Sequence, residues 1–127
     1  MSVVLIDLKS PTNEFPASMW NWRTAVAVIR DLNLIDEFLV RRMVENGSGV
    51  RIEKAEAHLI GNTIREVVLP KLEPNKRIYE NLTITDEQDD GTFYRQGAQN
   101  WKNFSASYRW LEDLADFCIS TEGFEVF

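Results

Sequence analysis

The chain has 127 residues, 44% of them hydrophobic, and carries a formal net charge of −6 at pH 7. This length suits one domain spanning residues 1–127, and the apolar fraction excludes intrinsic disorder. The negative charge excludes general binding to nucleic acid, because an acidic surface repels phosphate groups.

The excess of acids lies near the end of the chain. Residues 1–85 carry 11 acids and 11 bases, whereas residues 86–127 carry nine acids and three bases. No apolar run approaches the roughly 20 residues of a membrane span, and the first residues lack the basic start of a signal peptide. The single cysteine, Cys118, excludes an internal disulfide. We therefore expect a cytoplasmic protein with no membrane partner.

The first third of the chain predicts a strand followed by a helix. Residues 3–8 are rich in β-branched side chains, and the polar cluster at 10–13 ends them. Pro16 and Ser18 are start signals for an amphipathic helix, whose apolar residues recur at steps of three and four. We expect this helix to end at Asn33.

Residues 35–45 predict a second helix, which would form a helical hairpin with the first. Two glycines, Gly47 and Gly49, should end it because glycine tolerates a positive φ. The side chains that we expect this helix to bury are Phe38, Leu39 and Met43.

Residues 53–69 predict a third helix after a brief extended link at 50–52, and Pro70 should end it. The only histidine, His58, lies away from the apolar stripe of this helix, so we expect it on the surface. The residues of the stripe are Ala57, Ile60, Ile64, Val67 and Val68.

Shorter segments follow that predict a small antiparallel β element. Residues 77–85 suggest a strand with imperfect alternation, residues 86–91 a polar loop, and residues 92–94 a partner strand that pairs back as a hairpin. The tail, residues 123–127, also alternates like a strand. The whole pattern predicts an α+β fold dominated by about four amphipathic helices.

Residues 100–119 have the strongest periodicity and predict one long helix. Its apolar positions cover roughly 200° of the circumference, which is wider than the stripe of an ordinary surface helix. It is therefore either the central core helix or a contact between subunits. One stripe consists of Trp101, Phe104, Tyr108, Leu111, Ala115 and Cys118, and the second consists of Trp110, Leu114 and Phe117.

The polar loop partly matches a calcium-binding EF-hand loop. Asp86, Gln88 and Asp90 stand at its first, third and fifth positions, and Gly91 stands at the sixth. The twelfth position should supply a bidentate carboxylate, but it is Gly97. We therefore expect a solvated acidic turn, with these three residues as weak calcium candidates and no other metal site.

No group of residues indicates catalysis or a bound cofactor. His58 has no partner of a suitable type, and Cys118 lies on an apolar stripe, where burial would raise its pKa. The glycines at 47 and 49 precede no Lys-Ser or Lys-Thr pair, which excludes a P-loop. We expect no catalytic residue.

Aromatic residues remain as candidates for contact with a partner. Tryptophan and tyrosine are enriched at interaction hot spots, although in a small domain they also fill the core. For Trp20 and Trp110, which lie away from the centres of their stripes, both interpretations stay open. The interface candidates are Trp20, Trp110, Leu114 and Phe117.

Three short motifs together resemble a family of small, uncharacterised bacterial proteins. They are Trp22-Arg23-x-Ala25, then Asn46-Gly47-x-Gly49-Val50 before Glu53-x-Ala55-Glu56-Ala57, and Phe117-Cys118 before Gly123-Phe124-Glu125-Val126. The chain departs from the family pattern at residues 73–99. The resemblance implies a bacterial, cytoplasmic protein, and it implies no activity, cofactor or catalytic residue.

The hypothesis that follows is a non-enzymatic interaction protein, whose partner is another protein or a second copy of the chain. A specific form is an immunity-type inhibitor, with the acidic face steering it toward a basic toxin. The alternative is a small enzyme or ligand-binding domain that uses the acidic loop or a pocket lined by tryptophan and tyrosine.

Overall fold

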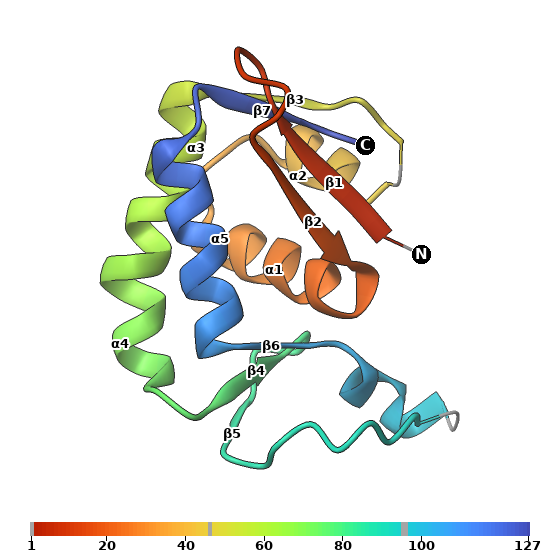
Figure 1. The fold of residues 1–127 in the computed structure, drawn as a ribbon. Helices are drawn as coiled ribbons and strands as arrows, with labels where there is room; N and C mark the ends of the chain where they lie inside the picture. Colours follow the sequence, from red (N-terminus) through yellow and green to blue (C-terminus); the bar gives the residue numbers. More distant parts are fainter. Residues whose placement is uncertain (1, 46, 95–96) are drawn as a thin grey trace.

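The computed structural model describes residues 2–45, 47–94 and 97–127, and within these ranges it contains no helix long and apolar enough to cross a membrane. The described chain is an α+β fold with two antiparallel sheets (Figure 1). The predicted class is confirmed, but the described residues form five α-helices rather than about four. The elements are β1 (Ser2–Asp7), β2 (Glu14–Ser18), α1 (Met19–Leu32), α2 (Glu37–Met43), β3 (Arg51–Glu53), α3 (Lys54–Thr63), the π-helical turn η1 (Ile64–Val68), α4 (Leu69–Leu72), β4 (Arg77–Tyr79), β5 (Ile84–Thr85), the 3-10 helix η2 (Gly97–Asn103), β6 (Ser105–Ser107), α5 (Tyr108–Ser120) and β7 (Gly123–Val126).

The larger sheet has the strand order β2-β1-β7-β3, and each neighbouring pair is antiparallel. The last strand, β7, lies inside this sheet, where Val126 pairs with Leu5 and Phe124 pairs with Ile52. All four side chains are buried in the core. The strands predicted at both ends of the chain are therefore confirmed, and the two ends meet in one sheet (Figure 1).

Strand β2 does not follow the sequence pattern, because Pro16 in its middle is typical of a helix start. Proline is tolerated there since β2 is an edge strand and needs hydrogen bonds only toward β1. Helix α1 begins directly afterwards at Met19. Its predicted end is confirmed, because Asn33 adopts the left-handed conformation with a φ of 53°.

Helices α1 and α2 are joined by a buried tryptophan. The indole N–H of Trp22 donates a hydrogen bond to the carbonyl of Met43 at 2.6 Å. Met43 is buried as predicted, but the expected burial of Phe38 is wrong, since 61% of that residue is exposed. Phe38 is two positions before the buried Val40, and two helical steps of 100° place it on the opposite face.

The third predicted helix continues beyond its expected end. Helix α3 passes through η1 into α4, which ends at Leu72 rather than at Pro70. In η1 the N–H of Leu69 bonds to the carbonyl of Ile64, five residues earlier. This wider turn places Pro70 in the first turn of α4, where its missing N–H costs no regular helical bond. Val67, expected in the buried stripe, is 40% exposed.

The segment predicted as one strand, residues 77–85, is instead the hairpin β4–β5. It turns back at Leu82, whose φ is 72°. Residues 92–94 form no strand, and the second neighbour of β4 is β6. The side-chain amide of Asn103 instead accepts from the backbone N–H of Tyr94 and donates to its carbonyl, each at 2.7 Å.

The predicted helix at 100–119 is also wrong as a single element. The stretch comprises the end of η2, then β6, then α5, and α5 begins only after Ser107, whose hydroxyl accepts from the N–H of Trp110 at 3.1 Å. Helix α5 packs against α3 and, through Phe117, against Phe15 and Phe124 of the larger sheet. Its wide apolar stripe therefore marks a core helix, so it no longer indicates a contact between subunits.

Candidate interaction surface

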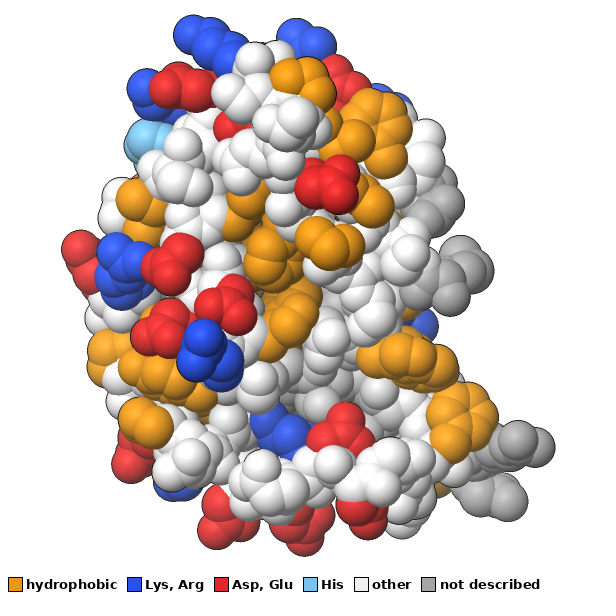
Figure 2. Space-filling view, in the orientation of Figure 1, with side chains coloured by type: hydrophobic (Ala, Val, Ile, Leu, Met, Phe, Trp, Pro, Cys, Tyr) orange, Lys and Arg blue, Asp and Glu red, His pale blue; other side chains and the backbone are white. Residues whose placement is uncertain are grey.

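The nine acidic side chains of residues 86–127 separate into two groups. Four form ion pairs with bases: Asp113 with Arg109, Asp116 with Arg65, Glu122 with Lys54 and Glu125 with Arg51. The other five form no ion pair with another described residue: Asp86, Glu87, Asp89, Asp90 and Glu112. Figure 2 shows acidic side chains along the lower rim of the molecule, where Figure 1 places the chain after β5. Within residues 86–127, the acids without an ion pair therefore lie mainly on residues 86–90, with Glu112 as the fifth.

Four of these acids lie on residues 86–90, which we call the acidic loop, and every residue of the loop is exposed. Polar contacts with the β4 segment fix the loop in place. Arg77 donates from Nε to the carbonyl of Glu87 at 2.7 Å, and the Gln88 amide donates to the carbonyl of Asn75 at 3.1 Å. These two bonds use backbone oxygens and not the carboxylates of the loop.

Hydrogen bonds keep Asp90 ionised and hold the Arg77 guanidinium in place. The Thr92 hydroxyl and N–H donate to Asp90 and hold its pKa below the ordinary value. Arg77 directs its remaining donors to the Ser105 hydroxyl at 3.0 Å and the Tyr79 hydroxyl at 3.1 Å. Burial raises the pKa of Tyr79, so it stays a neutral partner for the guanidinium.

An aromatic cluster lies beside the acidic loop and consists of Trp20, Phe93 and Phe104. Trp20 stacks on Phe104 with centroids 5.2 Å apart, and it meets Phe93 edge to face at 5.5 Å. Trp20 is 47% exposed and Phe93 is 53% exposed, whereas Phe104 is buried beneath them. Arg23 covers the Phe104 ring at 4.1 Å and pairs with Glu80 at 2.8 Å. The Trp20 and Phe93 rings are therefore held by ring contacts and are still open to solvent.

The cluster and the loop form a continuous surface. A hollow of about 360 Å³ is lined by Trp20 and Phe93 from the cluster and by Asp89 from the loop, together with Lys102. We call the combination of the aromatic cluster and the acidic loop the aromatic–acidic surface. Its aromatic rings come from the start of α1 and from the segment between β5 and β6, which lie far apart in sequence.

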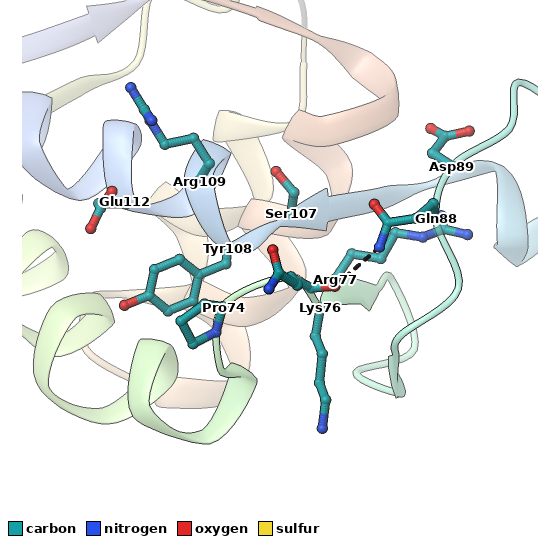
Figure 3. Close-up of a pocket in the computed structure, with 10 residues that line it drawn as sticks. Pro74, Lys76, Arg77, Gln88, Asp89, Ser107, Tyr108, Arg109 and Glu112 are labelled. Atoms are coloured by element: carbon teal, nitrogen blue, oxygen red, sulfur yellow. Dashed lines mark hydrogen bonds between the residues drawn. The ribbon is translucent and has the colours of Figure 1, made fainter.

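A second hollow, which we call the α5 pocket, adjoins the acidic loop on its other side and has a volume of about 480 Å³ (Figure 3). Tyr108 and Glu112 of α5 form one wall, and Gln88 and Asp89 of the loop lie across from them (Figure 3). Asp89 lines both hollows, so the α5 pocket and the aromatic–acidic surface are continuous.

The four interface candidates from the sequence have different environments. Trp20 is on the aromatic–acidic surface, and Trp110 is half-buried with its ring edge to face with Phe15 at 5.6 Å. Leu114 and Phe117 are buried, with 1% and 7% exposure, because α5 directs them into the core. They present almost no surface to a partner in this conformation, which corrects the choice of these two residues.

The calcium candidates gain no support from the geometry. Among the residues the structure describes, no three His, Cys, Asp or Glu side chains converge as a metal site. The Gln88 amide nitrogen faces the carbonyls of Asn75 and Asp86, so this side chain serves as a donor to the backbone. Asp86 and Asp90 therefore contribute negative charge to the acidic loop.

The two reactive residue types are also placed for structural roles. Cys118 is buried, and this burial raises its pKa to about 12, which keeps the thiol protonated. His58 is half-buried rather than freely exposed, and its Nε2 lies 3.0 Å from the carbonyl of Thr121. Neither side chain has the arrangement of a nucleophile with its base.

A buried carboxylate that the sequence pattern does not reveal is Asp7. Burial alone would raise its pKa, but hydrogen bonds from the Thr121 hydroxyl and from the amides of Lys9, Glu122 and Ser10 outweigh this effect and hold it well below the ordinary value. These bonds tie the end of β1 to the connection between α5 and β7. Asp7 is thus a structural charge, fully used within the fold.

No protein-family model, curated protein or solved structure matches the chain. The resemblance to small bacterial proteins therefore stays an expectation.

Proposed function

We propose that the chain is a non-enzymatic interaction protein that binds a basic protein through the aromatic–acidic surface. One observation carries the proposal: all five carboxylates of residues 86–127 that form no ion pair with another described residue belong to this surface or line the adjoining α5 pocket. Carboxylates without internal partners attract a basic protein and raise its rate of association. The acids elsewhere in this stretch are already neutralised by neighbours.

The aromatic cluster supplies the apolar part of such an interface. Exposed tryptophan and phenylalanine rings lose contact with water on binding, and aromatic anchors carry much of the energy of protein interfaces. Trp20 and Phe93 are held by ring contacts before any partner arrives. Little side-chain freedom would then be lost on association, which favours affinity.

The specific form of the proposal is an immunity-type inhibitor of a basic toxin. Its acidic surface would cover a basic region that the toxin uses on its own substrate. Growth of cells that express the protein encoded by the neighbouring gene tests this form. Co-expression of the chain should restore growth, and variants of the acidic loop should not. Rescue by those variants would exclude this form.

The binding proposal is tested with the immobilised chain and an extract of the source cells. We expect retention of one basic protein, weakened as salt rises from roughly 0.05 to 0.5 M. Two variants should no longer retain this basic protein. The first combines Trp20→Ala with Phe93→Ala, and the second neutralises all four acids of the acidic loop. The neutralising substitutions are Asp86→Asn, Glu87→Gln, Asp89→Asn and Asp90→Asn.

Matched controls separate this surface from exposed residues in general. Phe38→Ala removes a ring at α2 that is even more exposed than Trp20 and Phe93, and it should leave retention unchanged. A quadruple variant should do the same by neutralising four exposed carboxylates that lie elsewhere and form no ion pair among the described residues: Glu14→Gln, Asp31→Asn, Glu45→Gln and Glu66→Gln. Equal retention by all variants, or a strictly monomeric chain that retains no protein, contradicts the proposal. A dimer disrupted by the surface variants would identify a second copy as the partner.

The α5 pocket supports the alternative, a small enzyme or ligand-binding domain, because it is a concave site beside the acidic loop with Tyr108 in its wall. Thermal-shift measurements with calcium, nucleotides and sugars distinguish the two proposals. A ligand at about 100 times its Kd adds about 2.7 kcal/mol to the free energy of unfolding and raises the Tm. A flat screen would exclude this alternative for those ligand classes.

A further inference from the structure

The α5 pocket has an open acidic wall. Tyr108 and Glu112 are four residues apart on α5, so they lie on the same face of the helix. Both side chains are half-buried and line the pocket. Glu112 forms no hydrogen bond or ion pair with another residue that the structure describes. The wall therefore offers an aromatic ring beside an unused carboxylate.

The bases that line the pocket are already engaged. Lys76 pairs with Glu73 at 3.4 Å, and in Figure 3 its side chain extends away from Tyr108. Arg109 pairs with Asp113 at 3.3 Å, and its guanidinium points away from the acidic loop (Figure 3). The third base, Arg77, donates to three oxygens of the fold, as described above.

The balance of charge around the pocket favours a cation. The lining holds the bases Lys76, Arg77 and Arg109 and the acids Asp89 and Glu112. Two of the three bases are paired with acids outside the lining, Glu73 and Asp113. An anion would therefore meet bases that are mostly neutralised, together with two carboxylates, Asp89 and Glu112, that form no ion pair with another described residue. At the start of α5 the N–H of Trp110 also donates to the Ser107 hydroxyl, so this donor is not available to an anion.

We propose that the α5 pocket receives an arginine side chain of the partner, an inference that rests on the proposed binding of a basic protein. The guanidinium would stack on the Tyr108 ring and donate to the Glu112 carboxylate, with Asp89 supplying charge from the opposite wall. Arginine fits better than lysine because its planar fork combines stacking on an aromatic ring with paired hydrogen bonds to a carboxylate.

The first test uses a small probe in place of the partner. N-acetyl-arginine methylamide is titrated to about 20 mM while amide resonances are followed by NMR. Shifts should be confined to residues around Tyr108, Glu112 and Gln88. N-acetyl-citrulline methylamide, a neutral isostere, should bind at least about fivefold more weakly, because a hydrogen bond to a charged group contributes about 1 kcal/mol or more. Equal binding of the two probes, or no localised shift, would overturn the inference.

The variant Glu112→Gln keeps the size of the side chain and removes only its charge. It should weaken the binding of the arginine probe about fivefold. Glu66→Gln, at an exposed position of η1, should leave the binding of the probe unchanged. Inorganic phosphate should give no shift at the pocket, and preferential binding of phosphate would also overturn the inference.

The same variant separates this inference from the proposed function. If Glu112→Gln retains the basic protein as well as the wild type does, the arginine pocket is wrong and the aromatic–acidic surface still stands. If the loop and cluster variants also retain it, the proposed function is wrong as well. Loss of retention in Glu112→Gln together with loss of probe binding would support the pocket.

Discussion

Two regions of the molecule hold their structure in different ways. Around the larger sheet, α1, α3 and α5 bury a continuous apolar cluster that includes Trp22, Leu111 and Phe124. Between β4 and β6, order depends on polar bonds to the backbone and on ring contacts, and most of residues 80–103 are exposed. The first region provides stability. The second carries unpaired charge and open rings, so binding can be altered there without loss of the fold.

The largest expected effect comes from two tryptophans that are two residues apart. Trp22→Ala should lower the free energy of unfolding by about 3–5 kcal/mol, because it leaves a large cavity and removes the bond to Met43. Trp20→Ala should lower it by less than about 1 kcal/mol, because the side chain is half exposed. Denaturant unfolding measures both values. Equal losses would show that the aromatic cluster also stabilises the fold.

These two residues also show what the sequence could predict. Periodicity within α1 correctly places Trp22 on the buried face, because burial of an amphipathic helix is a local pattern. The same rule fails across β6, where the periodic positions Phe104 and Tyr108 belong to different elements. Residues 105–107 extend because they pair with β4, about 28 positions away, and local spacing does not contain that information.

The sequence predicts the negative charge of the aromatic–acidic surface but not which residues make it up. The excess of acids after residue 85 is visible in the sequence, and so is the exposed loop. Which carboxylates remain unpaired depends on ion pairs such as Arg51 with Glu125 and Arg65 with Asp116, which join distant segments. The exposed ring of Phe93 follows no helical or strand pattern, and it is the tertiary contact with Trp20 that makes it part of a cluster.

At low pH, the stability of the core region should depend on the buried carboxylate of Asp7. Its folded pKa is depressed, so its stabilisation is complete above its unfolded pKa of about 4 and is lost as pH falls toward the folded pKa. Asp7→Asn should lower the free energy of unfolding at pH 7 by about 1–3 kcal/mol. The difference from the wild type should shrink as pH decreases below about 4. Asp90→Asn should change the pH profile of stability in the same direction but much less, because its hydrogen bonds to Thr92 lie on the exposed loop and are screened by water. An equal response from both variants would contradict the distinction.

Glycines give a similar contrast of smaller size. A Cβ on Gly61 would lie 2.7 Å from the Ile119 side chain and 2.8 Å from the Ala115 carbonyl, where α3 packs on α5. Gly61→Ala should therefore lower the free energy of unfolding by about 1–2 kcal/mol through overpacking. A Cβ on Gly97 would have no atom within 4 Å. Gly97→Ala should therefore change the free energy of unfolding by less than about 0.5 kcal/mol. Thermal and denaturant unfolding would check the pair, and a neutral Gly61→Ala would mean that the two helices separate easily.

The smallest expected effect has the opposite sign. Thr24 of α1 is fully buried, and its hydroxyl has no hydrogen-bond partner among the residues the structure describes. Thr24→Val replaces this hydroxyl with a methyl group of similar size, so it should raise the free energy of unfolding by about 1 kcal/mol. Its retention of the basic protein should stay at the wild-type level, since Thr24 lies on the core side of α1. If Thr24→Val lowers the stability instead, the hydroxyl makes a hydrogen bond in solution. If retention falls while stability rises, the packing of the core and the binding surface are coupled, and the separation of the two regions does not hold.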